Sequence, residues 1–141
     1  MRPIVRIAER QEDFFRLIRL REEVFVVEQG VSIEIELDEA DDHAVHIIAT
    51  IKKEVIGTAR LVMKGKSGKI GRMAVRKAWR GKGVGSALIA FMKKVAKAKG
   101  VRPLYLHAQA PAVPFYERFG FAAEGELFHE AGIPHRKMVL K

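Results

Sequence analysis

Apolar side chains recur at helical spacing in two segments of the chain. The first segment runs from about residue 11 to 27, and the second begins directly after a glycine-rich turn near residue 83. The repeating apolar positions are Phe14, Leu17, Ile18, Val24 and Phe25 in the first segment and Val84, Leu88, Phe91 and Val95 in the second. Each pattern predicts an amphipathic helix with one face in the core.

Runs of branched apolar residues predict the strands. The two longest, residues 44–51 and 55–63, are joined by Lys52, Lys53 and Glu54, which suggests a hairpin, and a turn at 65–68 leads into a strand that ends at Val75. Shorter strands are expected at residues 3–8, 104–108, 121–124 and 136–140, and a short helix at 112–119 ends at Gly120. The mixture of helices and strands predicts an α/β fold in which helices cover a mixed sheet.

The turn between Val75 and the second helix predicts a ligand. It contains Arg80 and three glycines, Gly81, Gly83 and Gly85. Glycine lets the backbone approach a ligand closely, and the first N–H groups of a helix have no partners inside the helix and carry partial positive charge. A strand, turn and helix of this kind predict a diphosphate site. The glycine spacing excludes both the nucleoside-triphosphate loop G-x-x-x-x-G-K-[ST] and the dinucleotide loop G-x-G-x-x-G.

Two motifs resemble one known family. Arg80-x-x-Gly83-x-Gly85 is similar to the acetyl-CoA signature Q/R-x-x-G-x-G/A of the GCN5-related N-acetyltransferases (GNAT), and the block Phe115 to Phe121 (FYERFGF) is similar to that family's F-Y-E-x-x-G-F block. Residues 24–31, 36–38 with His46, and 131–135 resemble the ElaA/YjcF branch. The resemblance implies one GNAT domain over residues 1–141. Its expected sheet is mixed but mostly antiparallel, has six to seven strands and about four flanking helices, and is splayed at the acetyl-CoA cleft.

The resemblance also implies the contacts to acetyl-CoA. The backbone of residues 73–75 runs beside the pantetheine arm, and the Val75 amide is a candidate oxyanion-hole donor. Gln109 stands where many relatives have asparagine, which is a departure from the family pattern. The implied contact residues are Met73, Ala74, Val75, Arg80, Gly81, Lys82, Gly83, Val84, Gly85, Ser86, Gln109, Phe115 and Tyr116.

Tyr116 has the implied role of general acid, which protonates the sulfur of coenzyme A as it leaves. A phenol of pKa about 10 is a weak donor to a thiolate whose pKa is about 8.5. The alternative interpretation is an aromatic packing residue beside Phe115 and Phe119.

A general base is needed only for some acceptors. A lysine-like amine of pKa about 10.4 loses its proton at pH 7 at a cost of about 4.6 kcal/mol, whereas an α-amine of pKa near 8 costs about 1.4 kcal/mol. The candidates are Glu28, Asp38, His46 and His107, acting directly or through water. For each of them a structural role is the alternative, and both histidines lie in apolar strands.

The net charge of +9 is unevenly distributed. Residues 22–51 contain no lysine or arginine and nine acids, namely Glu22, Glu23, Glu28, Glu34, Glu36, Asp38, Glu39, Asp41 and Asp42. The rest of the chain, which holds the 26 basic residues and the other eight acids, therefore carries +18. A basic body suits coenzyme A, and an acidic wall suits a small cationic amine. The alternative is a solvated acidic loop that balances a basic protein.

Composition limits the remaining classes. The chain has no cysteine, which excludes disulfides and thiolate chemistry, and it shows no signal peptide or membrane-length apolar run, so a cytoplasmic protein without a membrane partner is expected. The histidines lack a third ligand at recognisable spacing, so no metal is expected. The dispersed lysines do not favour nucleic acid. A GNAT-fold protein that senses acetyl-CoA without turnover remains the alternative to an N-acetyltransferase, and a homodimer is left open.

Overall fold

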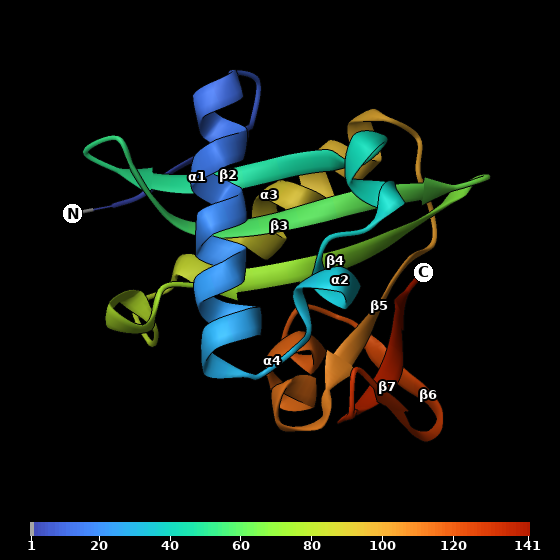
Figure 1. Ribbon diagram of the computed structural model, residues 1–141. Coiled ribbons are helices and arrows are strands. Elements are labelled where there is room, and N and C mark those ends of the chain that lie inside the picture. The colour runs from blue at the N-terminus through green and yellow to red at the C-terminus, as the bar shows by residue number, and fades with distance from the viewer. Residues whose placement is uncertain (1) are drawn as a thin grey trace.

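Seven strands form one mixed sheet in the order β1-β2-β3-β4-β5-β7-β6 (Figure 1). The computed structural model describes residues 2–141. β4 and β5 run parallel, and the other neighbours run antiparallel. The strands are β1 (Ile4–Ile7), β2 (Val45–Ile51), β3 (Glu54–Lys64), β4 (Ser67–Val75), β5 (Leu104–Gln109), β6 (Ala122–Glu130) and β7 (Ile133–Leu140).

Four α-helices accompany the sheet, which confirms the predicted fold class. They are α1 (Gln11–Arg21), α2 (Ile33–Glu36), α3 (Val84–Ala98) and α4 (Val113–Glu117). α1 continues without a break into a π-helical segment, η1 (Glu22–Glu28), and three 3₁₀ turns are η2 (Glu39–Asp42), η3 (Lys77–Trp79) and η4 (Ala110–Ala112). α1 and η1 together match the single helix predicted over residues 11–27.

α1 and α3 cover opposite faces of the sheet, as Figure 1 shows with α1 in front and α3 behind. The sheet has one hydrophobic cluster on each face. Successive residues of β2 point to opposite faces, so Ile47 packs in the cluster under α3 and Ile48 in the cluster under α1. Leu88 of α3 and Leu17 of α1 are fully buried in these clusters. Burial of a leucine side chain stabilises the fold by roughly 1.5–3 kcal/mol. The apolar faces predicted for the two helices are therefore the faces that pack against the sheet.

Two regions differ from the sequence-based prediction. β6 and β7 extend well beyond the predicted 121–124 and 136–140, and they meet at a turn at residues 131 and 132. α2 was not predicted, because its four residues are too short for helical periodicity to register. Both differences concern segments that line one end of the cavity between β4 and β5.

β4 and β5 separate in the middle of the sheet. Their pairing covers Gly68↔Leu104 to Ile70↔Leu106 and stops there, although both strands continue. A bulge in β4 follows at once, where Arg72 has a positive φ of 51° and the register against β3 shifts. Bulges bend a strand and redirect its side chains. The sheet is therefore splayed between β4 and β5, as predicted.

Close packing against β3 fixes the start of α3 at this splay. A Cβ on Gly57 would lie 2.8 Å from Val84 Cγ1, so only glycine lets the first turn of α3 approach the strand this closely. Gly83, the residue before α3, has a φ of 87°, which favours glycine. The turn is thus shaped to place the N-terminus of α3 beside the end of β4.

Candidate active site

A cavity of about 970 Å³ occupies the splay between β4 and β5. One end lies at the N-terminus of α3 and at α4, and the other end lies between α2, β3 and the β6–β7 turn. A single cavity thus joins the predicted diphosphate turn to the region that Figure 1 shows between α2 and the C-terminal strands.

The α3 end presents backbone N–H groups. Val84, Gly85 and Ser86 form the first turn of α3 and line the cavity, and no side chain caps this turn. A Cβ on Gly85 would lie 3.3 Å from the Phe115 ring, so α4 closes one side. Uncapped first-turn amides suit an anionic group.

The backbone of β4 contributes another donor. Arg76 N–H donates to the carbonyl of Ile56 at 2.8 Å across the β3 edge. Because successive N–H groups of a strand point to opposite edges, the Val75 N–H is directed to the splayed edge. Met73, Ala74 and Val75 all line the cavity.

Tyr116 is buried beside this stretch. Its hydroxyl donates to the thioether sulfur of Met73 at 3.3 Å, and its ring meets Phe115 edge to face at 5.0 Å. Burial raises the pKa of Tyr116 to about 12, so the phenol stays neutral over the physiological range. A thioether is a weak acceptor, so this hydroxyl is available to a stronger one.

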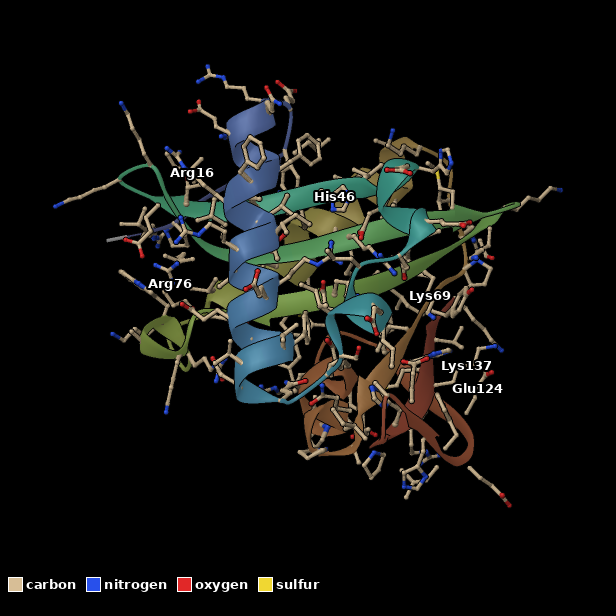
Figure 2. All side chains as sticks on the ribbon, viewed as in Figure 1. Arg16, His46, Lys69, Arg76, Glu124 and Lys137 are labelled. Atoms are coloured by element: carbon tan, nitrogen blue, oxygen red, sulfur yellow. The ribbon has the colours of Figure 1, made fainter. Side chains whose placement is uncertain are left out.

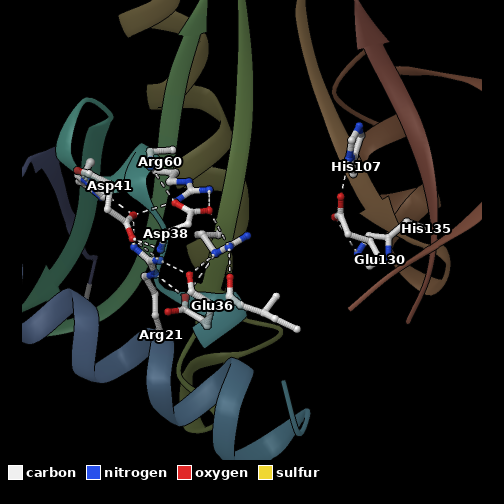
Figure 3. Close-up of polar contacts among 12 residues, drawn as sticks. Arg21, Glu36, Asp38, Asp41, Arg60, His107, Glu130 and His135 are labelled. Carbon is white, nitrogen blue, oxygen red and sulfur yellow. Dashed lines mark hydrogen bonds and ion pairs between the residues drawn. The ribbon is translucent and has the colours of Figure 1, made fainter. Parts of the chain in front are cut away.

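His107 belongs to a cluster on the opposite wall. Its Nδ1 lies 3.0 Å from Glu130 Oε1, and His135 Nε2 lies 3.8 Å from Glu130 Oε2 (Figure 3). Burial alone would raise the pKa of Glu130, but the hydrogen bond from His107 and nearby positive charges outweigh it and lower the pKa. All three side chains line the cavity. Glu130 and His135 were not among the predicted site residues, because only the register of β5, β6 and β7 brings them to His107.

Nearly the whole chain matches one family. The family model described as "Acetyltransferase (GNAT) domain" matches residues 8–141. The chain belongs to the GNAT family of N-acetyltransferases. The enzyme is 38% identical over 134 residues to the uncharacterized N-acetyltransferase YjcF of Bacillus subtilis, with 94% of this chain and 96% of that protein covered. It is 34% identical over 126 residues to protein ElaA of Escherichia coli, with 86% and 82% covered.

Solved structures agree with this assignment. The crystal structure of an acyl-CoA N-acyltransferase from Pseudomonas aeruginosa superposes with a TM-score of 0.89 at 30% identity, covering 99% of both chains. The crystal structure of Escherichia coli ElaA gives the same TM-score and identity and covers 98% of this chain and 99% of that one. The resemblance stated from the motifs is therefore confirmed for the family, its ElaA/YjcF-like relatives and the fold.

The predicted acetyl-CoA contacts of this GNAT enzyme mostly gather at the cavity. All of them line it except Lys82, whose ammonium lies 5.3 Å from the Trp79 ring centre. Arg80 lines it and donates from Nε to the Val75 carbonyl at 2.9 Å, while its Nη1 pairs with Glu28 at 2.9 Å. Gln109 donates to Gln29 Oε1 at 2.9 Å, which links the end of β5 to the residue after η1.

The four candidate bases lie in different places. His107 and Asp38 line the cavity, whereas Glu28 and His46 do not. His46 is 4% exposed, its Nε2 lies 3.0 Å from the Asp41 carbonyl, and Phe14 covers it edge on at 5.5 Å. Figure 2 shows His46 on the β2 side of the sheet, away from Lys69 beside the C-terminal strands. His46 has the surroundings of a structural histidine.

Three acids of the acidic segment, Glu36, Asp38 and Asp41, are paired with arginines from elsewhere in the fold. Arg21 Nε donates to Glu36 Oε1 at 2.6 Å, and its Nη1 donates to Asp41 at 2.7 Å. Arg60 donates to both oxygens of Asp38, at 2.7 and 3.0 Å, and to Asp41 at 2.8 Å. We call these residues together with Arg72 the arginine–carboxylate network (Figure 3).

The bulged residue Arg72 completes this network. It donates to the carbonyls of Glu36 and Ile35, at 3.0 and 3.1 Å, and to Asp38 Oδ2 at 3.2 Å. Three arginines from α1, β3 and β4 therefore balance three carboxylates of residues 36–41. The two acids of the expected wall that line the cavity, Glu36 and Asp38, are therefore both bound by arginines, and Asp38, fixed by Arg60 and Arg72, is poorly suited to act as a base.

The network predicts acid sensitivity. The hydrogen bonds from Arg60 lower the pKa of Asp38. Burial alone would raise the pKa of Asp41, but Arg21 and Arg60 lower it to about 2. Carboxyls with a lower pKa in the folded state stabilise it above their unfolded value of about 4, and this stability is lost as pH falls through the folded pKa. We expect the melting temperature to fall between pH 4 and pH 2. Asp41→Asn should lower it at pH 7 and flatten the acid dependence in calorimetry.

The neighbouring Asp42→Asn is the matched control for that experiment. Asp42 is exposed and forms no ion pair among residues 2–141, so its substitution should leave the acid profile unchanged. Equal profiles for the two variants would contradict the assigned role of Asp41.

Metal-binding clusters and membrane-length helices are both absent from the described residues 2–141. No group of three or more His, Asp or Glu side chains there is arranged to hold a metal ion. No helix in the same range is long and apolar enough to cross a membrane.

Proposed function

We propose that this enzyme transfers the acetyl group of acetyl-CoA to a primary amine. The observation that supports this most strongly is the shared cavity, since the uncapped first turn of α3, the Tyr116 hydroxyl and His107 all open onto it. The first turn supplies donors for a diphosphate, Tyr116 supplies a neutral donor, and His107 supplies a base.

Acetyl-CoA would lie along the splayed edge of β4. Its diphosphate is proposed to accept hydrogen bonds from the amides of residues 83–86, and its pantetheine arm to follow residues 73–75. The thioester carbonyl then accepts from the Val75 N–H, which is directed to that edge. Gln109 would contact the pantetheine arm from the β5 side.

His107 is the proposed general base. The neutral imidazole accepts the amine proton at Nε2 while Glu130 holds Nδ1, which also stabilises the imidazolium that results. The amine nitrogen attacks the thioester carbon, forming the C–N bond of a tetrahedral intermediate. Collapse of this intermediate breaks the C–S bond and yields the acetylated amine and coenzyme A.

Tyr116 is the proposed acid for the leaving sulfur. Its raised pKa keeps the proton on oxygen until negative charge develops on sulfur. A phenol of pKa about 12 is a weak acid toward a thiolate of pKa about 8.5, so its main effect is a charge-assisted hydrogen bond. Coenzyme A leaves as a thiolate stabilised by this hydrogen bond, and proton transfer from Tyr116 to sulfur is completed as the proton released by His107 returns to Tyr116 through solvent.

Calorimetric titration with acetyl-CoA, followed by a free-thiol release assay over amines, polyamines, amino sugars and peptides, tests this function. Tyr116→Phe is expected to lower kcat about 20-fold, because a hydrogen bond to a charged group is lost. The dissociation constant of acetyl-CoA should change less than about twofold, since the ring still packs on Phe115. Equal turnover by the Tyr116→Phe variant and the unmodified enzyme would remove Tyr116 from the mechanism.

The sensing alternative makes a different prediction in the same assay. A protein that only senses acetyl-CoA binds it and releases no thiol with any acceptor. Thiol release that depends on an amine excludes this alternative, and the absence of acetyl-CoA binding would overturn both functions.

A further inference from the structure

Lys69 is an unpaired cation at the end of the cavity remote from α3. It lies on β4 opposite Val62 of β3 and Tyr105 of β5, is half-buried and lines the cavity. It forms no hydrogen bond or ion pair within residues 2–141, and burial lowers its pKa. A half-buried charge without a partner is costly, so a ligand that supplies the opposite charge would be stabilised here.

The nearby carboxylates do not serve as that partner. Glu36 and Asp38 line the same cavity, but Arg21, Arg60 and Arg72 already bind them. Arg72 uses Nε and Nη2 for these contacts, and its Nη1 has no hydrogen-bond partner among the described residues. This wall therefore offers two donors with positive charge, Lys69 Nζ and Arg72 Nη1, and no free carboxylate.

The opposite charge lies across the cavity. Glu130 is 44% exposed and hydrogen-bonded to His107, and its carboxylate does not reach Lys69 within ion-pair distance. His107 is two residues beyond Tyr105 on β5, on the same face of the sheet. Lys69 is in register with Tyr105, so His107 follows at the next position of the same face, where β4 and β5 begin to separate. A positive and a negative subsite thus face one cavity.

We propose that the acceptor is an amine that also bears a carboxylate, of the amino-acid class. The carboxylate binds Lys69 Nζ and Arg72 Nη1, and the amine lies at His107 and Glu130. On this wall of the cavity, within residues 2–141, one lysine and one arginine nitrogen are without hydrogen-bond partners, and such a pair suits a group with one negative charge better than a phosphate. A polyamine would bring a second ammonium towards Lys69, so repulsion disfavours it. The inference rests on the proposed acetyl transfer and specifies its acceptor.

Matched acceptors test the proposal. Each common L-amino acid is assayed for acetyl-CoA-dependent thiol release beside its primary amide, which keeps the α-amine and removes the negative charge. The best acid should exceed its amide in kcat/KM by about 10- to 100-fold, the range of a lost charged hydrogen bond. Lys69→Gln should raise KM for the acid by a similar factor, with little change in KM for the amide or acetyl-CoA.

Lys66→Gln is the matched control, because Lys66 is exposed in the β3–β4 turn and does not line the cavity. It should behave as the unmodified enzyme. An amide as good as its acid, or a Lys69→Gln defect equal for both, would overturn the carboxylate subsite.

A binding measurement distinguishes failure of this inference from failure of the proposed function. The acids and amides are also titrated calorimetrically into the enzyme saturated with coenzyme A. If no acceptor releases thiol, the proposed function fails, yet binding of acids that Lys69→Gln abolishes would still support the subsite. If neither acids nor amides bind, the subsite is overturned.

Discussion

Replacement of Arg21 by methionine is expected to lower the free energy of unfolding by about 3–5 kcal/mol. Arg21 is 1% exposed, and its guanidinium binds Glu36, which is 2% exposed, and Asp41. The methionine fills much of the same volume but removes the 2.6 Å partner of the buried Glu36, which keeps the longer 3.5 Å ion pair to Arg72, and one of the two arginines that bind Asp41. Native domains are stable by only about 5–15 kcal/mol, so the variant would lose a large share of its stability.

Urea denaturation at pH 7 measures this effect, with Arg19→Met as control. Arg19 lies in the same helix, is exposed and forms no ion pair among residues 2–141, so its substitution should cost less than about 0.5 kcal/mol. The double variant Arg21→Met/Glu36→Met should regain part of the loss, because it removes the orphaned charge as well. A single variant as stable as the Arg19 control would contradict the network's assigned role.

Replacement of His107 by glutamine is expected to lower kcat/KM by two to three orders of magnitude at pH 7. Glutamine keeps a polar group near Glu130 but cannot take a proton from the amine. The defect should shrink as pH approaches the pKa of the acceptor amine, since solvent then supplies the neutral nucleophile. Initial rates of thiol release from pH 6.5 to pH 9.5 give this profile.

His129→Gln is the control for the histidine experiment. His129 is exposed on β6 and does not line the cavity, so its profile should match the unmodified enzyme. Glu130→Gln should show a smaller loss than His107→Gln, because the imidazole of His107 can still accept the amine proton. A His107→Gln defect that is the same at every pH would indicate a structural role and remove the base assignment.

Local chemistry explains why the α3 turn was predicted well. Gly83 has a positive φ, and Gly57 and Gly85 lie so close to neighbouring side chains that a Cβ would crowd them. Glycine meets both requirements, so these positions are recognisable in the sequence as glycines. The apolar stripe of the following helix was equally visible, because its buried positions recur with the helical repeat. The glycine turn and the helix that follows it could therefore be placed before any tertiary contact was known.

The surroundings of the acidic segment could not be predicted from local sequence. Its charge was counted correctly, but the arginines that pair with its acids come from α1, β3 and β4. One of these arginines, Arg72, lies at a bulge that the sequence pattern did not predict. Charge counts along the chain do not say which opposite charges meet in space. The interpretation of the segment consequently changes from an amine-binding wall to a neutralised support for the cavity.

The sequence by itself determined the family, the mixed sheet and the glycine turn before α3, and it named Tyr116 as an acid candidate, since each depends on residues close together in the chain. Only the tertiary structure decided which candidate base meets the cavity, because His107 gains Glu130 and His135 through the register of three strands. It also decided that Lys69 forms no ion pair among residues 2–141, while Glu36 and Asp38 are bound by arginines. The physical reason is that electrostatic interactions depend on distance in space and on burial, and neither can be read from position along the chain.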